Sequence, residues 1–230
     1  MKLSNKTEVL AKVCHHRGFG KDNTLQSISA GIKISPFLVE FDVQWSNNAL
    51  RLGHPPELGK ETLDEALQLF TDTNILPKID IKLTNQSFDQ AIDELVKFLE
   101  KWKPRKALIN ISGNLISDGY MQAEKRLMEL TDDNTLLNID LERYGRNDTN
   151  TVISHLRNLS RLPFSISPNL KDETAIAINL AKNLGITNIH FWSTFDDKHS
   201  IEFLHKQMKL CENNGLVVYF DIKTENICTD

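Results

Sequence analysis

Hydrophobic residues recur along the chain with two alternating periods. Short apolar runs with a period of two predict strands, and apolar residues spaced three or four apart between them predict helices. The stretch 39–43 shows the first pattern, because Val39, Phe41 and Val43 alternate with Glu40 and Asp42. We expect this stretch to form a buried strand whose two carboxylates share one face, since side chains two apart on a strand point the same way.

The same reading gives a succession of strands and helices. We expect strands at 8–14, 37–44, 75–83, 107–111, 135–141, 164–167, 188–192 and 216–222, with 49–52 as a short extension. Amphipathic helices are expected between them, at 24–32, 63–70, 88–102, 119–130, 152–159, 177–184 and 201–211. The helix at 88–102 has the clearest apolar stripe. Gly185 is expected to end the helix at 177–184.

Eight β/α steps of about 25–30 residues predict a (β/α)₈ TIM barrel. A doubly wound open sheet is the alternative, but no glycine-rich phosphate loop follows any of the expected strands. The closing strand can be either 216–222 or 226–229. Only eight residues follow Ile222 in the 230-residue chain, so we expect a small barrel in which the final helix can be missing.

Composition limits the possible functions. With 40% hydrophobic and 25% charged residues, the chain resembles an ordinary globular protein, and 1–230 is most simply one domain. A formal net charge of −4 does not favour nucleic acid as a partner. No apolar run reaches the length of a transmembrane segment, residues 1–7 are polar, and three widely spaced cysteines indicate no disulfide framework. We therefore expect a cytoplasmic protein, whose oligomeric state the sequence does not predict.

The candidate chemistry lies where the expected strands end, because working groups of a TIM barrel sit at the carboxyl ends of its strands. Two neighbouring carboxylates such as Glu40 and Asp42 repel each other unless a cation lies between them, and Mg²⁺ or Ca²⁺ suits such oxygen ligands. The groups expected on this rim are His16, Arg17, Glu40, Asp42, His54, Asp80 and Lys82. Together they predict a metal site next to an anion site with two proton-transfer groups.

These residues occur in an order that resembles the glycerophosphodiester phosphodiesterases, a family of phospholipase-C-like barrels. The resemblance runs through His16-Arg17-Gly18, Asp22-Asn23-Thr24, Glu40-x-Asp42, Gly53-His54, the stretch 62–67 and Asp80-x-Lys82. It covers 13–83 well, and only the β/α rhythm and Trp192 fit beyond that. The last residues, 227–230, resemble the end of the family's domain.

The resemblance implies roles for these positions. It implies that His16 and His54 are the acid/base pair, that Glu40, Asp42 and Asp80 bind the metal, and that two cations, Arg17 and Lys82, contact the phosphate. It also implies hydrolysis of a phosphodiester, either small or lipid-derived, to an alcohol and a phosphomonoester, and thus a place in lipid metabolism.

Three departures from the family pattern stand out. Pro55-Pro56 follows His54 where the family has Asp, Asp80 stands where Glu is commoner, and the capping insertion after His54 is missing. We therefore expect an open site whose preference for glycerol is not fixed. Two other functions stay open: a non-catalytic barrel that binds a phosphorylated ligand, and a lyase-like enzyme that releases a cyclic phosphate.

Other polar residues receive less weight. Asp140 and Glu142 repeat the carboxylate spacing at the end of a strand and are candidates for substrate contacts, as is Trp192, for which packing is favoured about two to one. Asp221 and Lys223 have similar standing. Surface or packing roles are expected for His155, His190, His199 and His205.

Overall fold

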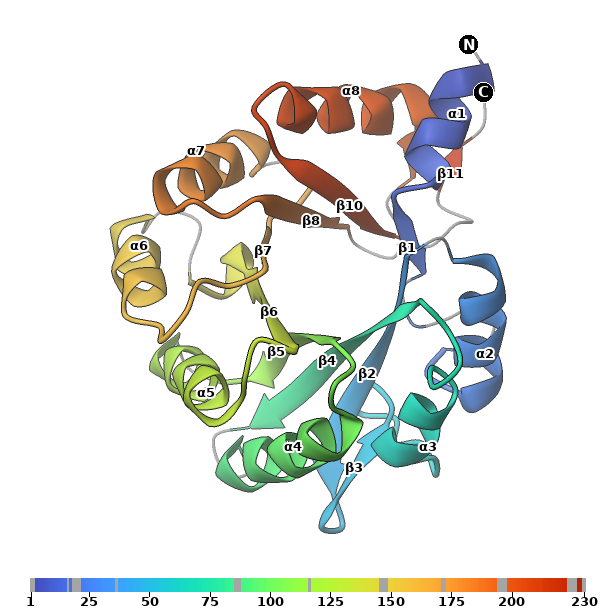
Figure 1. Cartoon of the computed structure of the whole chain (residues 1–230), viewed down its shortest axis with the longest axis vertical. Helices are drawn as coiled ribbons and strands as arrows, with labels where there is room; N and C mark the ends of the chain where they lie inside the picture. Colours follow the sequence, from blue (N-terminus) through green and yellow to red (C-terminus); the bar gives the residue numbers. More distant parts are fainter. Residues whose placement is uncertain are drawn as a thin grey trace.

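A computed structural model describes residues 3–15, 17, 22–35, 37–84, 88–115, 117–144, 149–170, 173–193, 198–222 and 227–228. Eight of the nine strands in its main sheet are parallel, in the order β1-β2-β4-β5-β6-β7-β8-β10, and β1 pairs with both β10 and β2, which closes the barrel. These strands are β1 (Val13–His15), β2 (Leu38–Ser46), β4 (Leu76–Thr84), β5 (Ala107–Asn114), β6 (Thr135–Asp140), β7 (Ser165–Ser167), β8 (Asn188–Trp192) and β10 (Val217–Ile222). The predicted TIM barrel is confirmed, and 216–222, not 226–229, supplies its last strand (Figure 1).

Helices surround the sheet and follow the predicted order. They are α2 (Leu25–Ile34), α3 (Leu63–Gln68), α4 (Phe88–Trp102), α5 (Ser117–Leu130), α6 (Thr149–Arg157), α7 (Thr174–Leu184) and α8 (Ile201–Glu212), with a 3₁₀ turn η1 (Leu141–Tyr144) after β6. Capping boxes begin two of them: Thr24 bonds with Ser27 at α2, and Thr62 bonds with Glu65 at α3. Gly185 ends α7 with a φ of 74°, as its C-terminal position predicts.

The first element differs from the prediction. Residues 8–14 were expected to be one strand, but a helix, α1 (Leu3–Leu10), precedes a strand of only three residues. Its apolar run is too short to distinguish a strand from a buried helix face. Val9 is fully buried, and Glu8 pairs with His205 and Lys209 of α8 at 3.5 and 3.2 Å. Helix α1 thus lies beside α8 in the ring of helices (Figure 1), and in the described residues no helix follows β10.

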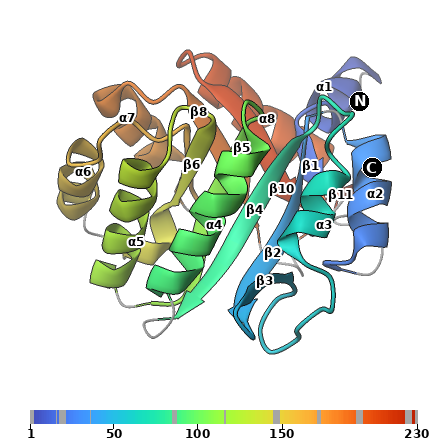
Figure 2. The same cartoon turned by 60° about the horizontal axis from the view of Figure 1, so that its bottom comes forward.

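Short strands complete the fold at its edges. The expected extension at 49–52 is β3 (Ala49–Leu52), which pairs antiparallel with β2 through a turn at Asn47 and Asn48. Both asparagines have positive φ, 51° and 56°, as this kind of turn requires. Two further strands, β9 (His199–Ser200) and β11 (Ile227–Cys228), pair with each other outside the barrel. β9 was not predicted, and β11 lies within 226–229, the stretch considered as the alternative closing strand. The arrowheads of β2 and β4 point to the end of the barrel where β3 lies (Figure 2).

The main hydrophobic core lies between the sheet and the helices. On β2, Val39, Phe41 and Val43 belong to it, and Phe41 packs against Phe70 with ring centroids 6.0 Å apart. The opposite face of the same strand carries Glu40 and Asp42. This alternation follows from the strand period of two and was predicted from the sequence.

Inside the barrel, the described residues include a small apolar cluster near the amino ends of the strands. It consists of Cys14, Leu38 and Leu108, with Phe37, Leu76, Leu136, Phe164 and Tyr219 packed against them. Further along, the interior is polar. Lys78 and Asp221 form an ion pair there, and since β4 and β10 are not neighbours, this pair must span the interior of the barrel.

Candidate active site

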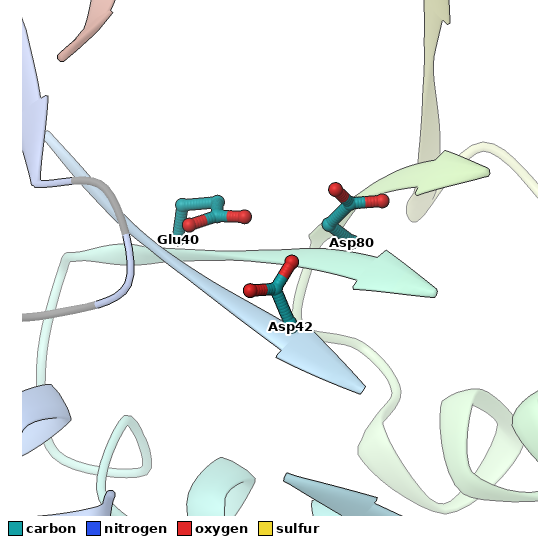
Figure 3. Close-up of side chains that lie close together, drawn as sticks. All are labelled: Glu40, Asp42 and Asp80. Carbon is teal, nitrogen blue, oxygen red and sulfur yellow. The ribbon is translucent and has the colours of Figure 1, made fainter. Parts of the chain in front are cut away.

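Three carboxylates converge inside the barrel, on the inner faces of β2 and β4. Oxygen atoms of Glu40, Asp42 and Asp80 lie within 4.8 Å of one another, and Figure 3 shows the three side chains facing a common space. They are 1%, 0% and 8% exposed. Asp42 and Asp80 are opposite each other in the parallel register of the two strands, which explains why they meet. The structure thus brings together the three residues predicted as metal ligands.

Asparagine 23 fixes the position of Asp42. Its Nδ2 donates a hydrogen bond to Asp42 Oδ2 at 2.9 Å, and its Oδ1 accepts one from the Asp42 backbone N–H at 2.8 Å. Asn23 has a φ of 53°, a left-handed conformation that asparagine tolerates better than most residues. From the sequence, Asn23 is predicted only as a member of the motif Asp22-Asn23-Thr24. The signal in the sequence was an asparagine directly before Thr24, the capping residue of α2.

A chain of polar side chains supports Asp80 along the inner wall. Asp80 Oδ1 accepts hydrogen bonds from Ser112 Oγ at 2.6 Å and from Asn110 Nδ2 at 3.1 Å. Asn110 Oδ1 accepts from Asn138 Nδ2 at 3.0 Å, and Asn138 Oδ1 accepts from Ser165 Oγ at 2.6 Å. The chain therefore runs across four successive strands and holds Asp80 toward the interior. None of these supporting residues was predicted.

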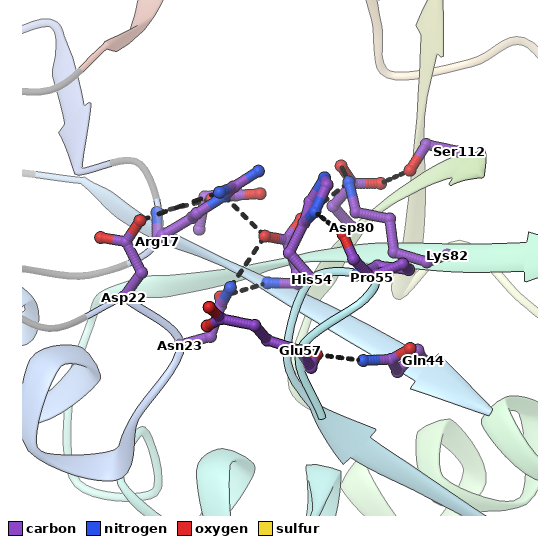
Figure 4. A network of polar contacts seen from close by, with 12 residues as sticks. Arg17, Asp22, Asn23, Gln44, His54, Pro55, Glu57, Asp80, Lys82 and Ser112 are labelled. Carbon is purple, nitrogen blue, oxygen red and sulfur yellow. Dashed lines mark hydrogen bonds and ion pairs between the residues drawn. The ribbon is translucent and has the colours of Figure 1, made fainter. Parts of the chain in front are cut away.

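Two cations predicted to bind phosphate lie against the carboxylates. Arg17 donates its backbone N–H to Glu40 Oε2 at 2.6 Å, and its Nε lies 2.6 Å from Asp42 Oδ2. Lys82 Nζ lies 2.7 Å from Asp42 Oδ1 and 2.5 Å from Asp80 Oδ2. Figure 4 shows Arg17 and Lys82 within the network of polar contacts that includes Asp80. Both cations thus sit at the site, at positions from which they already compensate the carboxylate charge.

The electrostatics of the cluster follow from this arrangement. Burial acts to raise the pKa of the Asp80 carboxyl, but the Lys82 ammonium and the hydrogen bonds to Asp80 outweigh it and lower the pKa to about 2. Burial acts to lower the pKa of the Lys82 ammonium, but Asp80 and Asp42 outweigh it, so that its pKa lies above the usual value. The same balance raises the pKa of Lys78, which Asp221 and Glu40 stabilise. These groups are therefore ionised at neutral pH.

The residues of the cluster fit a divalent cation. Hard oxygen ligands are what Mg²⁺ and Ca²⁺ prefer. Asp42 Oδ1 is buried and has no well-aligned hydrogen-bond donor in the described part of the chain, although Lys82 Nζ is near it. A buried carboxylate oxygen that lies close to two other carboxylates is a suitable metal ligand. Glu40, Asp42 and Asp80 are thus the residues that would hold the ion.

A cavity of about 630 Å³ opens beside Arg17. Its wall includes His54, Asn23 and Thr24 together with the loop 53–61, which connects β3 to α3. His54 is partly exposed, and its Nδ1 lies 2.8 Å from the Pro55 carbonyl oxygen. Because a carbonyl only accepts, Nδ1 carries the hydrogen, and Nε2 is the basic nitrogen of the neutral ring. His16, the other predicted proton-transfer residue, lies outside the described residues.

The remaining predicted contacts lie at other strand ends. Asp140 is buried at the end of β6 and accepts a hydrogen bond from the Glu142 backbone N–H at 3.1 Å. Glu142 and Trp192 are partly buried, and the Trp192 Nε1 is buried without an acceptor among the described residues. These positions are compatible with substrate contacts, which stay a prediction. Lys223 lies outside the described residues.

The histidines expected to have packing roles are mostly buried. His155 pairs with Glu124 at 2.7 Å, His199 lies 2.7 Å from Ser193 Oγ, and His190 lies inside the barrel 4.0 Å from Asp221. The acidic partners of His155 and His190 do not follow from the sequence pattern.

Solved structures with similar folds include phosphodiesterases. A phosphodiesterase from Oleispira antarctica, in complex with its product sn-glycerol 3-phosphate, shares 15% identity with a TM-score of 0.63, over 94% of each chain. A protein from Agrobacterium tumefaciens, provisionally assigned as a glycerophosphoryl diester phosphodiesterase, shares 15% identity with a TM-score of 0.61, over 91% of this chain and 92% of that one. A monomeric dihydrodipicolinate synthase variant also matches, with 14% identity, a TM-score of 0.53 and coverage of 93% and 69%.

Sequence comparisons add nothing to these likenesses, because no protein-family model and no curated protein matches the chain. In the described residues, no helix combines the length and apolar character needed to cross a membrane. At 15% identity the structural likeness establishes the fold, and a synthase shares that fold too. The chain is therefore a small TIM barrel similar in structure to glycerophosphodiester phosphodiesterases, with a buried acidic cluster inside it.

Proposed function

We propose that this protein is a metal-dependent phosphodiesterase related to the glycerophosphodiester phosphodiesterases, acting on a glycerophosphodiester-like or lipid-derived substrate. The observation that carries the proposal is the convergence of Glu40, Asp42 and Asp80 within 4.8 Å, beside a cavity lined by Arg17 and His54. The fold shared with phosphodiesterases, one of which binds sn-glycerol 3-phosphate, supports it.

In this mechanism the chain's own residues bind the phosphate and move protons. Arg17 and Lys82 supply positive charge for phosphate oxygens, as arginine and lysine commonly do. One of His16 and His54 accepts the proton of the attacking hydroxyl or water, and the other donates a proton to the oxygen of the leaving alcohol. A divalent cation bound by the three carboxylates would polarise the phosphoryl group. The phosphorus–oxygen bond to the alcohol breaks as the bond to the nucleophile forms.

The open cavity bears on the substrate and the product. Between β3 and α3 the chain has only the loop 53–61, without an inserted capping segment. An open mouth admits alcohols of different size, so we propose no strict preference for glycerol. The same openness leaves two products to distinguish, a phosphomonoester or a cyclic phosphate formed by attack of a neighbouring substrate hydroxyl.

The test is a hydrolysis screen. Glycerophosphodiesters, lysophospholipids and a chromogenic phosphodiester should be tested with Mg²⁺, Mn²⁺ and Ca²⁺, and ³¹P NMR should identify the product as monoester or cyclic phosphate. We expect metal-dependent turnover that EDTA abolishes. Specific binding of a phosphorylated ligand without any turnover would instead support the binding barrel.

Histidine variants separate catalysis from binding. His16→Ala and His54→Ala should each lower turnover by roughly 10²–10⁴-fold while metal affinity, measured by calorimetry, stays unchanged. Asp42→Ala should abolish metal binding and turnover together. His205→Ala is the matched control, since His205 contacts Glu8 on the outside of the barrel. Turnover that survives both His16→Ala and His54→Ala would exclude the proposed acid/base pair.

A further inference from the structure

The ammonium group of Lys82 occupies the space between two of the proposed metal ligands. Its Nζ lies 2.7 Å from Asp42 Oδ1 and 2.5 Å from Asp80 Oδ2, and the side chain is only 9% exposed. Lys82 is two residues after Asp80 on β4, so both side chains point into the barrel. The lysine therefore bridges the same carboxylates that would share a divalent cation.

Without such a bridge the two carboxylates would have little compensation. Asp42 Oδ2 is engaged by Arg17 and Asn23, whereas the ion pair with Lys82 is the contact seen for Asp42 Oδ1 among the described residues. The oxygen of Asp80 that faces Lys82, Oδ2, is not the one held by Ser112 and Asn110. Two carboxylates whose oxygen atoms lie within 4.8 Å of each other repel strongly in a buried site. The lysine supplies the cation that both oxygens need.

We propose that Lys82 is a built-in counterion that competes with the divalent cation for Asp42 and Asp80, and that it turns toward the substrate phosphate when the cation binds. This inference rests on the proposed function for the phosphate, but the competition itself concerns only the chain and the cation. In this proposal Lys82 pairs with Asp42 and Asp80 before the cation binds, and with the substrate phosphate afterwards. The site then acquires its full positive charge toward phosphate only when the cation is present.

Competition of this kind weakens the apparent metal affinity. We assume that the carboxylates accept the cation only when the lysine has left them. The apparent dissociation constant for the cation then equals the intrinsic constant divided by the fraction of molecules in which the lysine has left. A lysine that is in place at least nine-tenths of the time would weaken binding by about tenfold or more. By linkage, phosphate should also increase metal affinity by the factor by which the metal increases phosphate affinity.

The direct test is calorimetric titration of Mn²⁺ into the metal-free wild type and into Lys82→Met. We expect the variant to bind Mn²⁺ at least about tenfold more tightly, although its turnover falls because a phosphate contact is lost. If Lys82 had only a structural role, its replacement by Met would lower both the Mn²⁺ affinity and the turnover. Lys97→Met is the control, since Lys97 lies on the surface of α4 and pairs with Glu94 at 3.0 Å. Equal or weaker Mn²⁺ binding by Lys82→Met would overturn the inference.

A second measurement uses the unmodified protein, so it does not depend on how well the variant folds. Crystals soaked with Mn²⁺ should show Lys82 Nζ beyond hydrogen-bond distance of Asp42 and Asp80, and Nζ still in contact with both would refute the competition. The outcomes are also separable from the proposed function. If Lys82→Met binds Mn²⁺ more tightly but no diester is hydrolysed by the wild type, the counterion role of Lys82 stands and the enzymatic function is rejected. If the wild type shows metal-dependent hydrolysis but Lys82→Met does not bind Mn²⁺ more tightly, the enzymatic function stands and the counterion role is rejected.

Discussion

The ion pair inside the barrel allows a sharp test of how its interior is stabilised. Lys78 and Asp221 are 4% and 1% exposed and come from β4 and β10, which are not neighbours in the barrel. We consider Lys78→Met, which keeps a long side chain of similar shape but removes the charge. The change takes the Lys78 ammonium away from buried Asp221 and removes the attraction between Lys78 and Glu40.

The structure sets the expected magnitude. Two opposite charges about 4 Å apart near a protein interior attract by about 4 kcal/mol at an effective dielectric constant of 20. Removal of one partner of a buried pair typically costs about 3–5 kcal/mol, because the other charge stays uncompensated. We therefore expect Lys78→Met to lower the free energy of unfolding by about 3–5 kcal/mol, and Asp221→Asn to cause a loss of the same order.

The double variant distinguishes the cost of an unpaired charge from the loss of packing. Lys78→Met with Asp221→Asn removes both charges, and replacement of a buried pair by neutral residues is often close to neutral. We expect the double variant to be more stable than either single variant in urea unfolding at pH 7, with EDTA present. Lys97→Met at the exposed pair on α4 should change stability by less than about 1 kcal/mol. A strictly additive cycle, or a loss below about 1 kcal/mol for Lys78→Met, would refute the reasoning.

Three further predictions concern single positions. Gly113→Ala should destabilise the protein by at least about 2 kcal/mol in thermal unfolding, because the φ is 113° and an added Cβ would lie 2.2 Å from the Leu83 carbonyl oxygen, whereas Gly185→Ala, with φ 74° and open space, should cost about 1 kcal/mol. Asn23→Ala should weaken Mn²⁺ binding by about tenfold in calorimetry, because Asp42 loses its two hydrogen bonds to Asn23; unchanged affinity would show that Asp42 is held without Asn23. In EDTA, Asp80→Asn should lower stability at neutral pH by about 2 kcal/mol, since the folded pKa is about 2 against 3.8. A lowered carboxyl pKa stabilises the fold above the unfolded value, so the difference from wild type should vanish as pH falls from about 4 to about 2; a difference constant over that window would contradict it.

Most of the fold could be predicted because local patterns determine it. The strand period places Glu40 and Asp42 on one face and Val39, Phe41 and Val43 on the other, and the helical spacing of 88–102 is equally plain. The parallel succession of these units then predicts a barrel whose strand ends gather the polar residues. The convergence of Glu40, Asp42 and Asp80 follows from these rules alone.

What the sequence did not reveal depends on contacts between distant residues. Lys78 and Asp221 are 143 positions apart, and each occupies a strand position that local patterns cannot distinguish from a solvated one. Only the closure of the barrel brings them together. Helix α1 was missed for a related reason: its apolar face is too short to show a period, and packing against α8 decides its structure.

The two faces of the sheet therefore have different roles: the outer face packs against the helices, and the inner face holds the charged groups. Burial of apolar side chains supplies most of the stability of a domain, and here it occurs mainly between the sheet and the helices. The interior of the barrel contributes a small apolar cluster and then a series of ion pairs, whose net contribution to stability is expected to be small. An interior that is not needed as the main core can hold charges in fixed places. That division explains how the barrel can keep four carboxylates, Glu40, Asp42, Asp80 and Asp221, beside three cations, Arg17, Lys78 and Lys82, and still fold. The imbalance of one negative charge within this set favours a further cation near the carboxylates.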